Sequence, residues 1–319
     1  MPDYAIAIDL GGTNLRVAAF RPSGDLLDKV SVPTNISLGR EHLMEAIVSG
    51  IQQVRKKHAR DKLRGIGIGV PGFILLEKGI ITKSPNLPGL ENFPMRDDLE
   101  QRLGCPVVLE NDANAAALGE KWKGAGRAVD DLVLLTLGTG IGGGIISGGK
   151  ILHGYLGMAG ELGHIVVDPP STVRCGCGNY GCLEVNASAT AIVRMAHEAI
   201  LANRSPALTA RQSGEITSAL VYDLALAGDA ECRAIFEHMG RALGLGLGIL
   251  INTFNFPLYL LSGGVLAAWD LFAPAMLDEA RKRSLTLRET TTRIERAELG
   301  DLAGLYGAAC LALEAQPRR

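Results

Sequence analysis

The feature that most constrains the fold is a short pattern that occurs twice, 127 residues apart. DLGGT, at 9–13, coincides with TLGTG, at 136–140, when the chain is shifted by that interval. In both copies an apolar segment runs into glycines and a second apolar segment follows, which is typical of a buried strand that leads into a hairpin. Two similar α/β halves with a cleft between them are the simplest arrangement that this repeat predicts.

Apolar periodicity places further elements around the two copies. Strands are expected at 4–10, 15–20, 29–33, 65–70, 106–109, 131–137 and 258–261, and helices at 230–252, at 302–314 and from residue 112 onward. We therefore expect an α/β protein with a smaller domain at 1–118 and a larger domain at 119–301. A final helix, at about 302–319, is expected to pack back on the smaller domain.

The composition indicates a globular protein and excludes several kinds of partner. Hydrophobic residues make up 47% of the chain, and 32 basic residues nearly balance 34 acidic ones. We therefore expect no surface that attracts a polyanion and no nucleic-acid partner. The first residues, MPDYAIAIDL, carry no basic leader, and the apolar run LGLGLGILI is too short and too rich in glycine to span a bilayer. We expect a cytoplasmic protein with no membrane partner.

The run GTGIGG at 138–143 fits the spacing G-x-G-x-x-G of dinucleotide-binding sites. That fingerprint requires a helix after the glycines, whereas the residues that follow, GIISGG, predict a strand and a hairpin turn. What remains is a pair of glycine turns, Gly11-Gly12-Thr13 and Gly138-Thr139-Gly140. Such turns expose backbone N–H groups that suit a phosphate chain. The alternative is that the glycines only make tight hairpins.

Two asparagines and an aspartate occupy loop or junction positions. Asp112 lies between a predicted strand and a predicted helix, where it is either an ordinary N-cap or a functional carboxylate at a domain junction. Asn111, beside it, is a candidate to hydrogen-bond a substrate. Asn86, in the loop SPNLPG, is either a structural loop residue or another substrate-binding amide. The residues alone leave these alternatives open.

Three of the six cysteines lie within eight residues, in CGCGNYGC. Together with the preceding histidine they supply three thiolates and an imidazole, a closed tetrahedral zinc set with no position left for water. The four candidate ligands are His164, Cys175, Cys177 and Cys182. A disulfide would leave one cysteine unpaired in a reducing compartment, and a C-x-C redox switch is the third alternative.

Two acidic residues flank the cysteine-rich segment. Glu161 precedes His164 by three positions, so that one helical turn puts both on one face. If His164 binds zinc, the metal fixes a segment with Glu161 on one side and Glu184 on the other. The isolated cysteines are expected to be small apolar core residues: Cys105, Cys232 and Cys310.

Several motifs follow one another in an order that covers essentially the whole chain: DLGGTN, GVPG, SPNLPG, ENDANAAALGE, LGTGIGGG, GELGH and CGCGNYGCLE. In these motifs the chain resembles the ROK family of sugar kinases, and within it the bacterial glucokinases. The resemblance implies an actin-like ATPase (ribonuclease H-like) fold with an interdomain cleft. It also implies ATP and Mg²⁺ as cofactors, phosphorylation of a hexose at its 6-hydroxyl, and a homodimer.

The resemblance further assigns roles to single residues. Asp112 corresponds to the catalytic base, and Asp9 is the expected carboxylate near Mg²⁺. The positions that correspond to sugar contacts are Asn86, Asn111, Asp112, Glu161, His164 and Glu184. The positions that correspond to nucleotide contacts are Gly11, Gly12, Thr13, Asn14, Gly138, Thr139, Gly140, Gly263 and Gly264. The last turn reads SGG where a third glycine is common in the family.

Three functions are compatible with these observations. The first is an ATP-dependent hexose kinase, with glucose expected and mannose, allose, fructose, N-acetylglucosamine or N-acetylmannosamine as alternatives, because single polar contacts separate these sugars. The second is a sugar-responsive transcription regulator, which the lack of a basic face disfavours. The third is a zinc hydrolase at the cysteine cluster, which a closed ligand set disfavours.

Overall fold

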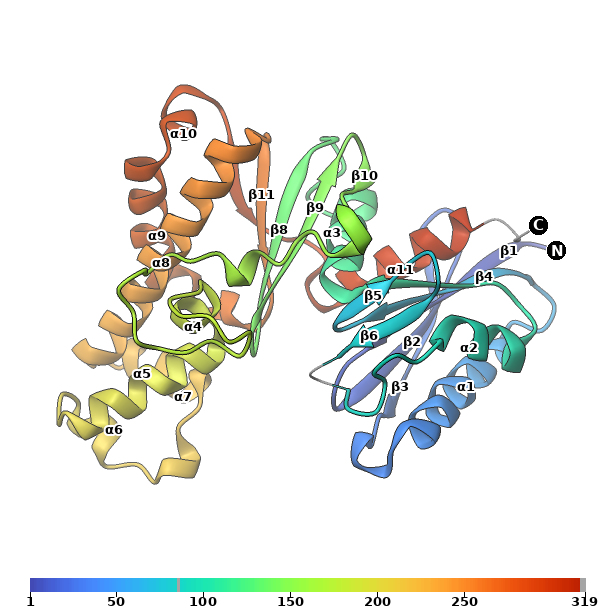
Figure 1. Ribbon diagram of the computed structural model, residues 1–319, viewed down its shortest axis with the longest axis horizontal. Coiled ribbons are helices and arrows are strands. Elements are labelled where there is room, and N and C mark those ends of the chain that lie inside the picture. Colours follow the sequence, from blue (N-terminus) through green and yellow to red (C-terminus); the bar gives the residue numbers. More distant parts are fainter. Residues whose placement is uncertain (85–86, 316–319) are drawn as a thin grey trace. The chain divides into compact units, whose positions relative to one another are not determined.

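The structure is a computed structural model that describes residues 1–84 and 87–315 (Figure 1). Its strands are β1 (Asp3–Leu10), β2 (Asn14–Phe20), β3 (Leu26–Pro33), β4 (Lys62–Val70), β5 (Phe73–Leu75), β6 (Ile80–Lys83), β7 (Val107–Asn111), β8 (Leu132–Leu137), β9 (Ile141–Ser147), β10 (Lys150–Ile151), β11 (Leu258–Ser262) and β12 (Arg293–Arg296). Its α-helices are α1 (Arg40–Lys57), α2 (Met95–Leu103), α3 (Asp112–Lys123), α4 (Glu184–Ala187), α5 (Ala189–Leu201), α6 (Pro206–Thr209), α7 (Ser218–Leu226), α8 (Ala230–Phe254), α9 (Trp269–Arg283), α10 (Leu285–Glu289) and α11 (Ala303–Glu314). The α/β class expected from the sequence is confirmed.

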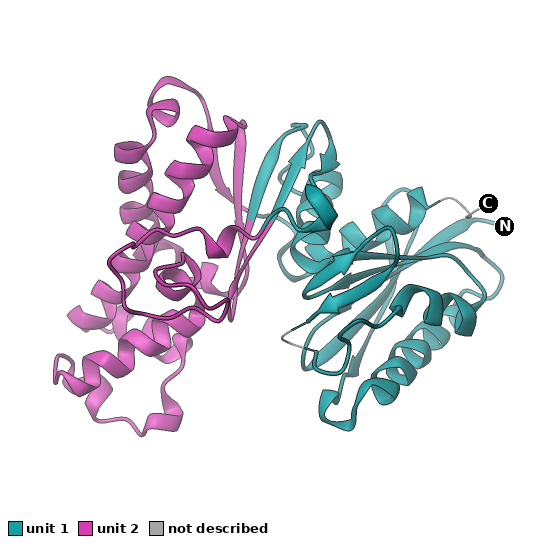
Figure 2. Cartoon of the chain, in the orientation of Figure 1, with its two compact units in different colours: residues 1–134, 144–160, 297–319 teal, residues 135–143, 161–296 magenta. Residues whose placement is uncertain are grey.

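The chain divides into two compact units, coloured separately in Figure 2. Unit 1 comprises 1–134, 144–160 and 297–319, and unit 2 comprises 135–143 and 161–296. This division differs from the boundary expected after residue 118, because α3 continues unbroken to Lys123 and packs against α11 inside unit 1. Strands β8 and β9 each continue from one unit into the other.

The strand order places each glycine turn between two neighbouring strands. Unit 1 contains a mixed sheet in the order β3-β2-β1-β4-β7, in which β1 pairs antiparallel with β2 and parallel with β4. The second sheet has the order β10-β9-β8-β11-β12, and β5 pairs with β6 in a small hairpin. The strand–turn–strand pattern that the sequence predicts twice is therefore present as β1–β2 and as β8–β9.

The sheet of unit 1 separates two apolar clusters. Successive side chains of a strand point to opposite faces. Ile6 and Ile8 accordingly pack in the cluster that contains Ile47 of α1, whereas Ala7 packs with Leu305 of α11 on the other face. The strands present large side chains to α1 but the small side chains of Ala7 and Ala18 to α11, so α11 lies close to the strands.

Glycines permit the close approach of α11 to its neighbours. A Cβ atom at Gly67 of β4 would overlap the backbone carbonyl oxygen of Ala308 in α11. A Cβ atom at Gly307 would likewise overlap the carbonyl oxygen of Ala115 in α3. Because these neighbours are backbone atoms, which do not rotate away as a side chain would, both positions require glycine.

Helix α8 is the core helix of unit 2. A Cβ atom at Gly240 would overlap the carbonyl oxygen of Phe272, and one at Gly244 would overlap that of Met276, so its glycines let α9 approach. Among the described residues α8 is the one helix long and apolar enough to cross a membrane, which the run LGLGLGILI by itself did not indicate. Within the protein 67% of its apolar window is buried, and packing in the core accounts for its apolar character.

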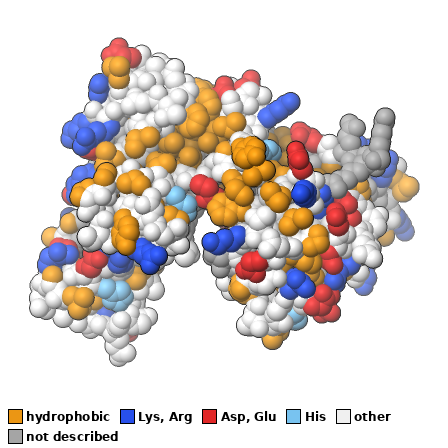
Figure 3. Space-filling view, viewed as in Figure 1, with side chains coloured by type: hydrophobic (Ala, Val, Ile, Leu, Met, Phe, Trp, Pro, Cys, Tyr) orange, Lys and Arg blue, Asp and Glu red, His pale blue; other side chains and the backbone are white. Residues whose placement is uncertain are grey.

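Charged side chains are mixed on the surface. On the face shown in Figure 3, acidic and basic side chains are interspersed over both units. Some ion pairs lie within one helix, such as Lys282 with Asp278 and Arg283 with Glu279 in α9. This face agrees with the near balance of charges in the sequence.

We expect Gly67→Ala to lower the free energy of unfolding by about 1–3 kcal/mol, because the added methyl group pushes α11 off the sheet. Denaturant unfolding measures this difference. Gly214→Ala is the matched control, since nothing lies within 4 Å of a Cβ atom at that glycine. The control is expected to stay within about 0.5 kcal/mol of the parent protein. Equal stabilities for the two variants would show that α11 does not depend on this close approach.

Candidate active site

The junction between β7 and α3 carries two of the predicted site residues. Asn111 is the N-cap of α3, and its side-chain oxygen accepts hydrogen bonds from the backbone N–H groups of Ala113, at 2.9 Å, and Asn114, at 3.2 Å. Its amide nitrogen donates to the carbonyl oxygen of Gly72 at 3.3 Å. The interpretation of Asp112 as the N-cap is therefore wrong: Asp112 is the first helical residue, and its carboxylate accepts from Ala113 N at 2.9 Å.

A buried carboxylate that the sequence analysis missed fixes this junction. Glu110, with a side chain 3% exposed, accepts from Asn111 N at 2.9 Å and from the Asn114 side-chain amide at 3.1 Å through Oε1. Its Oε2 lies 2.7 Å from Nε2 of His153, in the loop after β10. A buried carboxylate is costly unless it is paired and hydrogen-bonded. The pairing therefore ties the loop at His153 to the residues that flank Asp112.

The Glu110 contact also changes the titration of its partner. The hydrogen bond to Glu110 raises the pKa of His153, against the opposing effect of partial burial. The pair is consequently an ion pair over a wider pH range than an isolated histidine would allow. The glutamate of the END tripeptide was visible in the sequence, but the histidine 43 residues away gave no signal of its own.

The first glycine turn connects β1 to β2. Gly11 N donates to the carbonyl oxygen of Asn14 at 3.0 Å, which closes the turn. Thr34, directly after β3, supports the turn: its backbone N–H donates to Thr13 O at 3.0 Å and its hydroxyl donates to Gly12 O at 2.8 Å. The carbonyl oxygens of Gly12, Thr13 and Asn14 are thus bonded to the protein, which suits a site for an anion.

Asp9, at the end of β1, is paired with an arginine. Arg16 Nε donates to Asp9 Oδ2 at 3.1 Å, and the NH2 group of the same guanidinium contacts the same oxygen. The other arm of Arg16 donates to Asp301 at 2.8 Å, in the segment that precedes α11. This arginine, which lies seven residues after Asp9 on the adjacent strand, was not predicted as a site residue.

The second glycine turn lies in unit 2, between β8 and β9. Gly138 N donates to Gly140 O at 3.0 Å, and Gly138 O accepts from Ala189 N at 2.9 Å. Thr139 O accepts from the Thr190 hydroxyl at 2.7 Å. At Gly263, where φ is +100°, a Cβ atom would overlap the backbone of Leu137, so this third glycine position packs directly on the end of β8. Gly264 follows it as the first residue of a short 3₁₀ helix.

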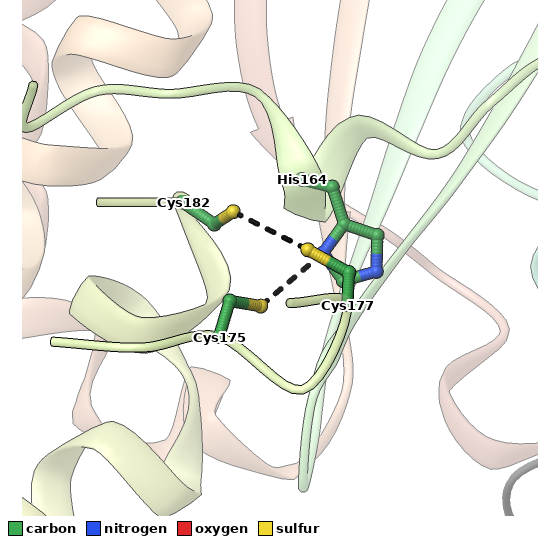
Figure 4. Close-up of side chains that lie close together, drawn as sticks. All are labelled: His164, Cys175, Cys177 and Cys182. Carbon is green, nitrogen blue, oxygen red and sulfur yellow. Dashed lines mark hydrogen bonds between the residues drawn. The ribbon is translucent and has the colours of Figure 1, made fainter. Parts of the chain in front are cut away.

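The four predicted metal ligands converge in unit 2 (Figure 4). One donor atom from each of His164, Cys175, Cys177 and Cys182 lies within 4.8 Å of all the others. Cys175 Sγ is 3.5 Å from His164 Nδ1, and Cys177 Sγ is 3.7 Å from Cys182 Sγ. All six cysteines are free, and the latter distance is well beyond the roughly 2.0 Å of a disulfide bond, so the disulfide alternative is not supported.

The donor set fits a soft divalent cation. Burial raises the pKa of Cys175 to about 12 and also raises that of Cys182. A hydrogen bond from the backbone of Asn179 lowers the pKa of Cys177. The buried thiols of Cys175 and Cys182 become thiolates when a cation compensates their charge, and three sulfurs with one imidazole nitrogen match a tetrahedral zinc site. Gly178 and Gly181 have φ values of +97° and +67°, which let the loop fold around the cluster.

The acidic residues that flank the cluster lie beside it. Glu161 directly precedes the 3₁₀ helix at Leu162–His164, and its carboxylate is 3.9 Å from His164 Nε2. Burial raises the pKa of Glu161. Glu184 is the first residue of α4, and its Oε1 is 3.6 Å from Cys175 Sγ. Unit 2 thus brings Glu161, His164 and Glu184 together, whereas Asn111 and Asp112 belong to unit 1.

Four further residues singled out in the sequence lie away from these sites or outside the described residues. Asn86 lies outside the described residues. Cys232 and Cys310 are buried, as expected for core cysteines, and Cys105 is partly buried against the apolar cluster of unit 1.

Comparison with known proteins gives a consistent result. The sequence model of the ROK family matches residues 5–315. A glucokinase from Halalkalibacterium halodurans is 38% identical over 97% of this chain and 94% of its own length. A glucokinase from Thermotoga maritima is 37% identical over 97% of each chain. A xylose repressor from Caldicellulosiruptor bescii is 32% identical over 97% of this chain and 77% of its own length.

Solved structures resemble the protein over nearly all of its length. A ROK hexokinase from Thermus thermophilus has a TM-score of 0.83 and 37% identity and covers 96% of each chain. A ROK family glucokinase from Streptomyces griseus, in complex with glucose and AMPPNP, has a TM-score of 0.81 and 33% identity. That comparison covers 98% of this chain and all of the other.

We expect the His153–Glu110 pair to stabilise the fold in a pH-dependent way. Because the folded-state pKa of His153 is raised, the stabilisation is complete below the unfolded pKa, roughly 6.5, and is lost as the pH rises through the folded value. His153 is partly exposed, so the contribution is about 1 kcal/mol. Denaturant unfolding from pH 5.5 to 9 should show a difference between the parent protein and His153→Gln that shrinks toward high pH. A difference independent of pH would exclude the ion pair.

Proposed function

The chain belongs to the ROK family, and on this premise we propose that it transfers the γ-phosphoryl group of ATP to the 6-hydroxyl of glucose. It is a sugar kinase with the actin-like ATPase fold. Glucose is supported as the acceptor by two glucokinases 37–38% identical to the chain, and ATP by the relative solved with glucose and AMPPNP. The products are glucose 6-phosphate and ADP.

The observation that carries the proposal is the β7–α3 junction. Phosphoryl transfer requires positioning, charge stabilisation and a group that accepts the proton of the attacking hydroxyl. Asp112 is that general base in the proposal: its carboxylate takes the 6-hydroxyl proton as the oxygen attacks the γ-phosphorus in line. Asn111 caps α3, and Glu110 accepts hydrogen bonds from Asn111 N and the Asn114 side chain at the end of β7. The backbone on both sides of Asp112 is therefore fixed before substrates bind.

The glycine turns are assigned to the nucleotide. The N–H groups of Gly11 and Gly138 close their own turns, so in the proposal the N–H groups of Gly12, Thr13, Thr139 and Gly140 face the phosphates. Asn14, Gly263 and Gly264 are further nucleotide contacts. Mg²⁺, when bound with ATP, neutralises the phosphate charges. Asp9 is the carboxylate that would hold a hydrated Mg²⁺, and both Arg16 contacts to it end on Oδ2.

The Cys/His cluster, meaning His164, Cys175, Cys177 and Cys182, is assigned to a structural zinc. A tetrahedral ion held by four protein ligands has no position for water or substrate, so the zinc takes no part in the chemistry. Its effect is to fix the segments that carry Glu161 and Glu184. We assign the side chains of Asn86, Asn111, Glu161, His164 and Glu184 to hexose hydroxyls, which agrees with their carboxylate, amide and imidazole chemistry.

A second candidate function is regulation of transcription. It is favoured by one observation, the likeness to a xylose repressor over 97% of this chain. Sugar binding in this case would alter DNA binding and not turnover. A gel shift on genomic DNA at moderate salt distinguishes the kinase from the transcription regulator: the kinase proposal predicts no retarded band.

We further propose that the protein is a cytoplasmic homodimer, in keeping with the family resemblance.

We expect Asp112→Asn to lower turnover by roughly 10²–10⁴-fold while leaving the fold and hexose binding largely intact, because the amide cannot accept the proton. A coupled ADP-release assay measures this, run with glucose, mannose, allose, fructose, N-acetylglucosamine and N-acetylmannosamine. Asp97→Asn, on the exposed side of α2, is the matched control and should keep parental turnover. Near-parental turnover of Asp112→Asn would remove the base assignment, and preference for another sugar would correct the substrate.

We expect Cys177→Ala to release zinc, to lower thermal stability and to raise the Michaelis constant for the hexose about tenfold or more. The cause is the loss of a ligand that holds the Glu161 and Glu184 segments together. Metal analysis and steady-state kinetics measure the two effects, and Cys105→Ala serves as a control that should retain the metal. An unchanged Michaelis constant after zinc loss would place the cluster away from the hexose.

A further inference from the structure

The carboxylate of Glu184 lies directly against the second glycine turn. Its Oε2 accepts a hydrogen bond from the backbone N–H of Ile141 at 3.0 Å, immediately after Gly140. A Cβ atom at Gly140 would overlap the same oxygen. The Glu184 carboxylate therefore lies in the space that a side chain at position 140 would take.

The other oxygen of Glu184 faces the Cys/His cluster. Oε1 lies 3.6 Å from Cys175 Sγ, on the opposite side of the carboxylate from Ile141. One side chain thus spans from a proposed zinc ligand to the backbone of the turn at Gly138–Gly140. All of these groups belong to unit 2.

The chain segments before and after the three cysteines also contact the turn at Gly138–Gly140. After Glu184 in the chain, Ala189 N donates to Gly138 O at 2.9 Å and the Thr190 hydroxyl donates to Thr139 O at 2.7 Å. Before the cysteines, a Cβ atom at Gly163 would overlap the carbonyl oxygen of Ile141. The segments that flank the Cys/His cluster on each side are therefore packed on the turn.

We propose that Glu184 is a positioning residue for the nucleotide-binding turn, which it couples to the zinc-held loop. This inference rests on the proposed function, because it needs the turn to bind the phosphates of ATP. A carboxylate accepts from a backbone N–H more strongly than a neutral group does, so it fixes the plane of the Gly140–Ile141 peptide. Zinc at the cluster fixes Cys175 and so the position of Glu184 beside it. Nucleotide affinity consequently depends on the loop even before any sugar binds.

The dissociation constant for AMPPNP with Mg²⁺, measured calorimetrically without sugar, tests the proposal. We expect it to rise roughly tenfold in Glu184→Ala and less in Glu184→Gln, whose amide oxygen can still accept from Ile141 N. The opposite expectation applies if Glu184 merely lies near the turn. Removal of a negative charge beside a polyanion would then leave the affinity unchanged or improve it, and that result in both variants would overturn the proposal.

Glu161→Gln is the matched control, because it changes the same residue type beside the same cluster without a contact to the turn. It should weaken hexose binding and leave the AMPPNP dissociation constant as in the parent protein. If Glu161→Gln lost as much AMPPNP affinity as the Glu184 variants, any disturbance of the loop would be enough to weaken nucleotide binding. That result would contradict a specific role for Glu184.

Two measurements keep the outcome clear if Glu184→Ala disturbs the loop. Metal analysis should give about one zinc per chain in the parent protein and in Glu184→Gln. Thr190→Val removes only the exposed hydroxyl that bonds Thr139 O and is expected to weaken AMPPNP binding about threefold. Unchanged AMPPNP affinity in Thr190→Val, Glu184→Ala and Glu184→Gln together would overturn the proposal. A parent protein that binds no AMPPNP would instead refute the proposed function itself.

Discussion

Four donor atoms, three sulfurs and one nitrogen, lie within 4.8 Å of one another in a segment that has little regular structure of its own. Between β10 and α4 the chain forms short 3₁₀ turns and isolated bridges, such as the one between Val166 and Cys182. A segment of this kind buries too few apolar side chains to fix its shape. When zinc binds such ligands, its binding free energy becomes folding free energy for the loop. In the proposal, that cross-link sets the positions of Glu161 and Glu184 and, through Glu184, that of the second glycine turn.

In unit 1, where no cysteine cluster is present among the described residues, buried carboxylates fix irregular segments instead. Glu110 binds the backbone of Asn111 and the ring of His153. Glu120, at the other end of the same motif and fully buried, accepts from the backbone N–H groups of Ala125, at 2.9 Å, and Leu299, at 2.8 Å. Each carboxylate ties an irregular segment to α3. The motif ENDANAAALGE therefore combines one residue assigned to chemistry with two that hold loops.

The strands that flank the two glycine turns and the helices α3, α8 and α11 could be predicted from the sequence, because they leave local apolar patterns, whereas α5 and α9 were not predicted. The ligand cluster was predictable for a similar reason, since three of its members are close together in the chain. The N-cap was misplaced by one residue: Asp and Asn are both good caps, and only the contacts of Asn111 decide between them. Pairs such as Glu110 with His153 and Glu184 with Ile141 join residues 43 positions apart in each case. No single-sequence pattern indicates such pairs, because tertiary packing alone brings them together.

The coordination of zinc tests the central claim most directly, because a closed ligand set is what gives the metal a purely structural role. X-ray absorption at the zinc edge, on protein loaded with one equivalent of zinc, measures the scattering atoms around the ion. The account predicts three sulfur atoms at about 2.3 Å and one nitrogen atom at about 2.0–2.1 Å. An oxygen atom in place of one of the sulfurs would reveal an open coordination position and would contradict the account.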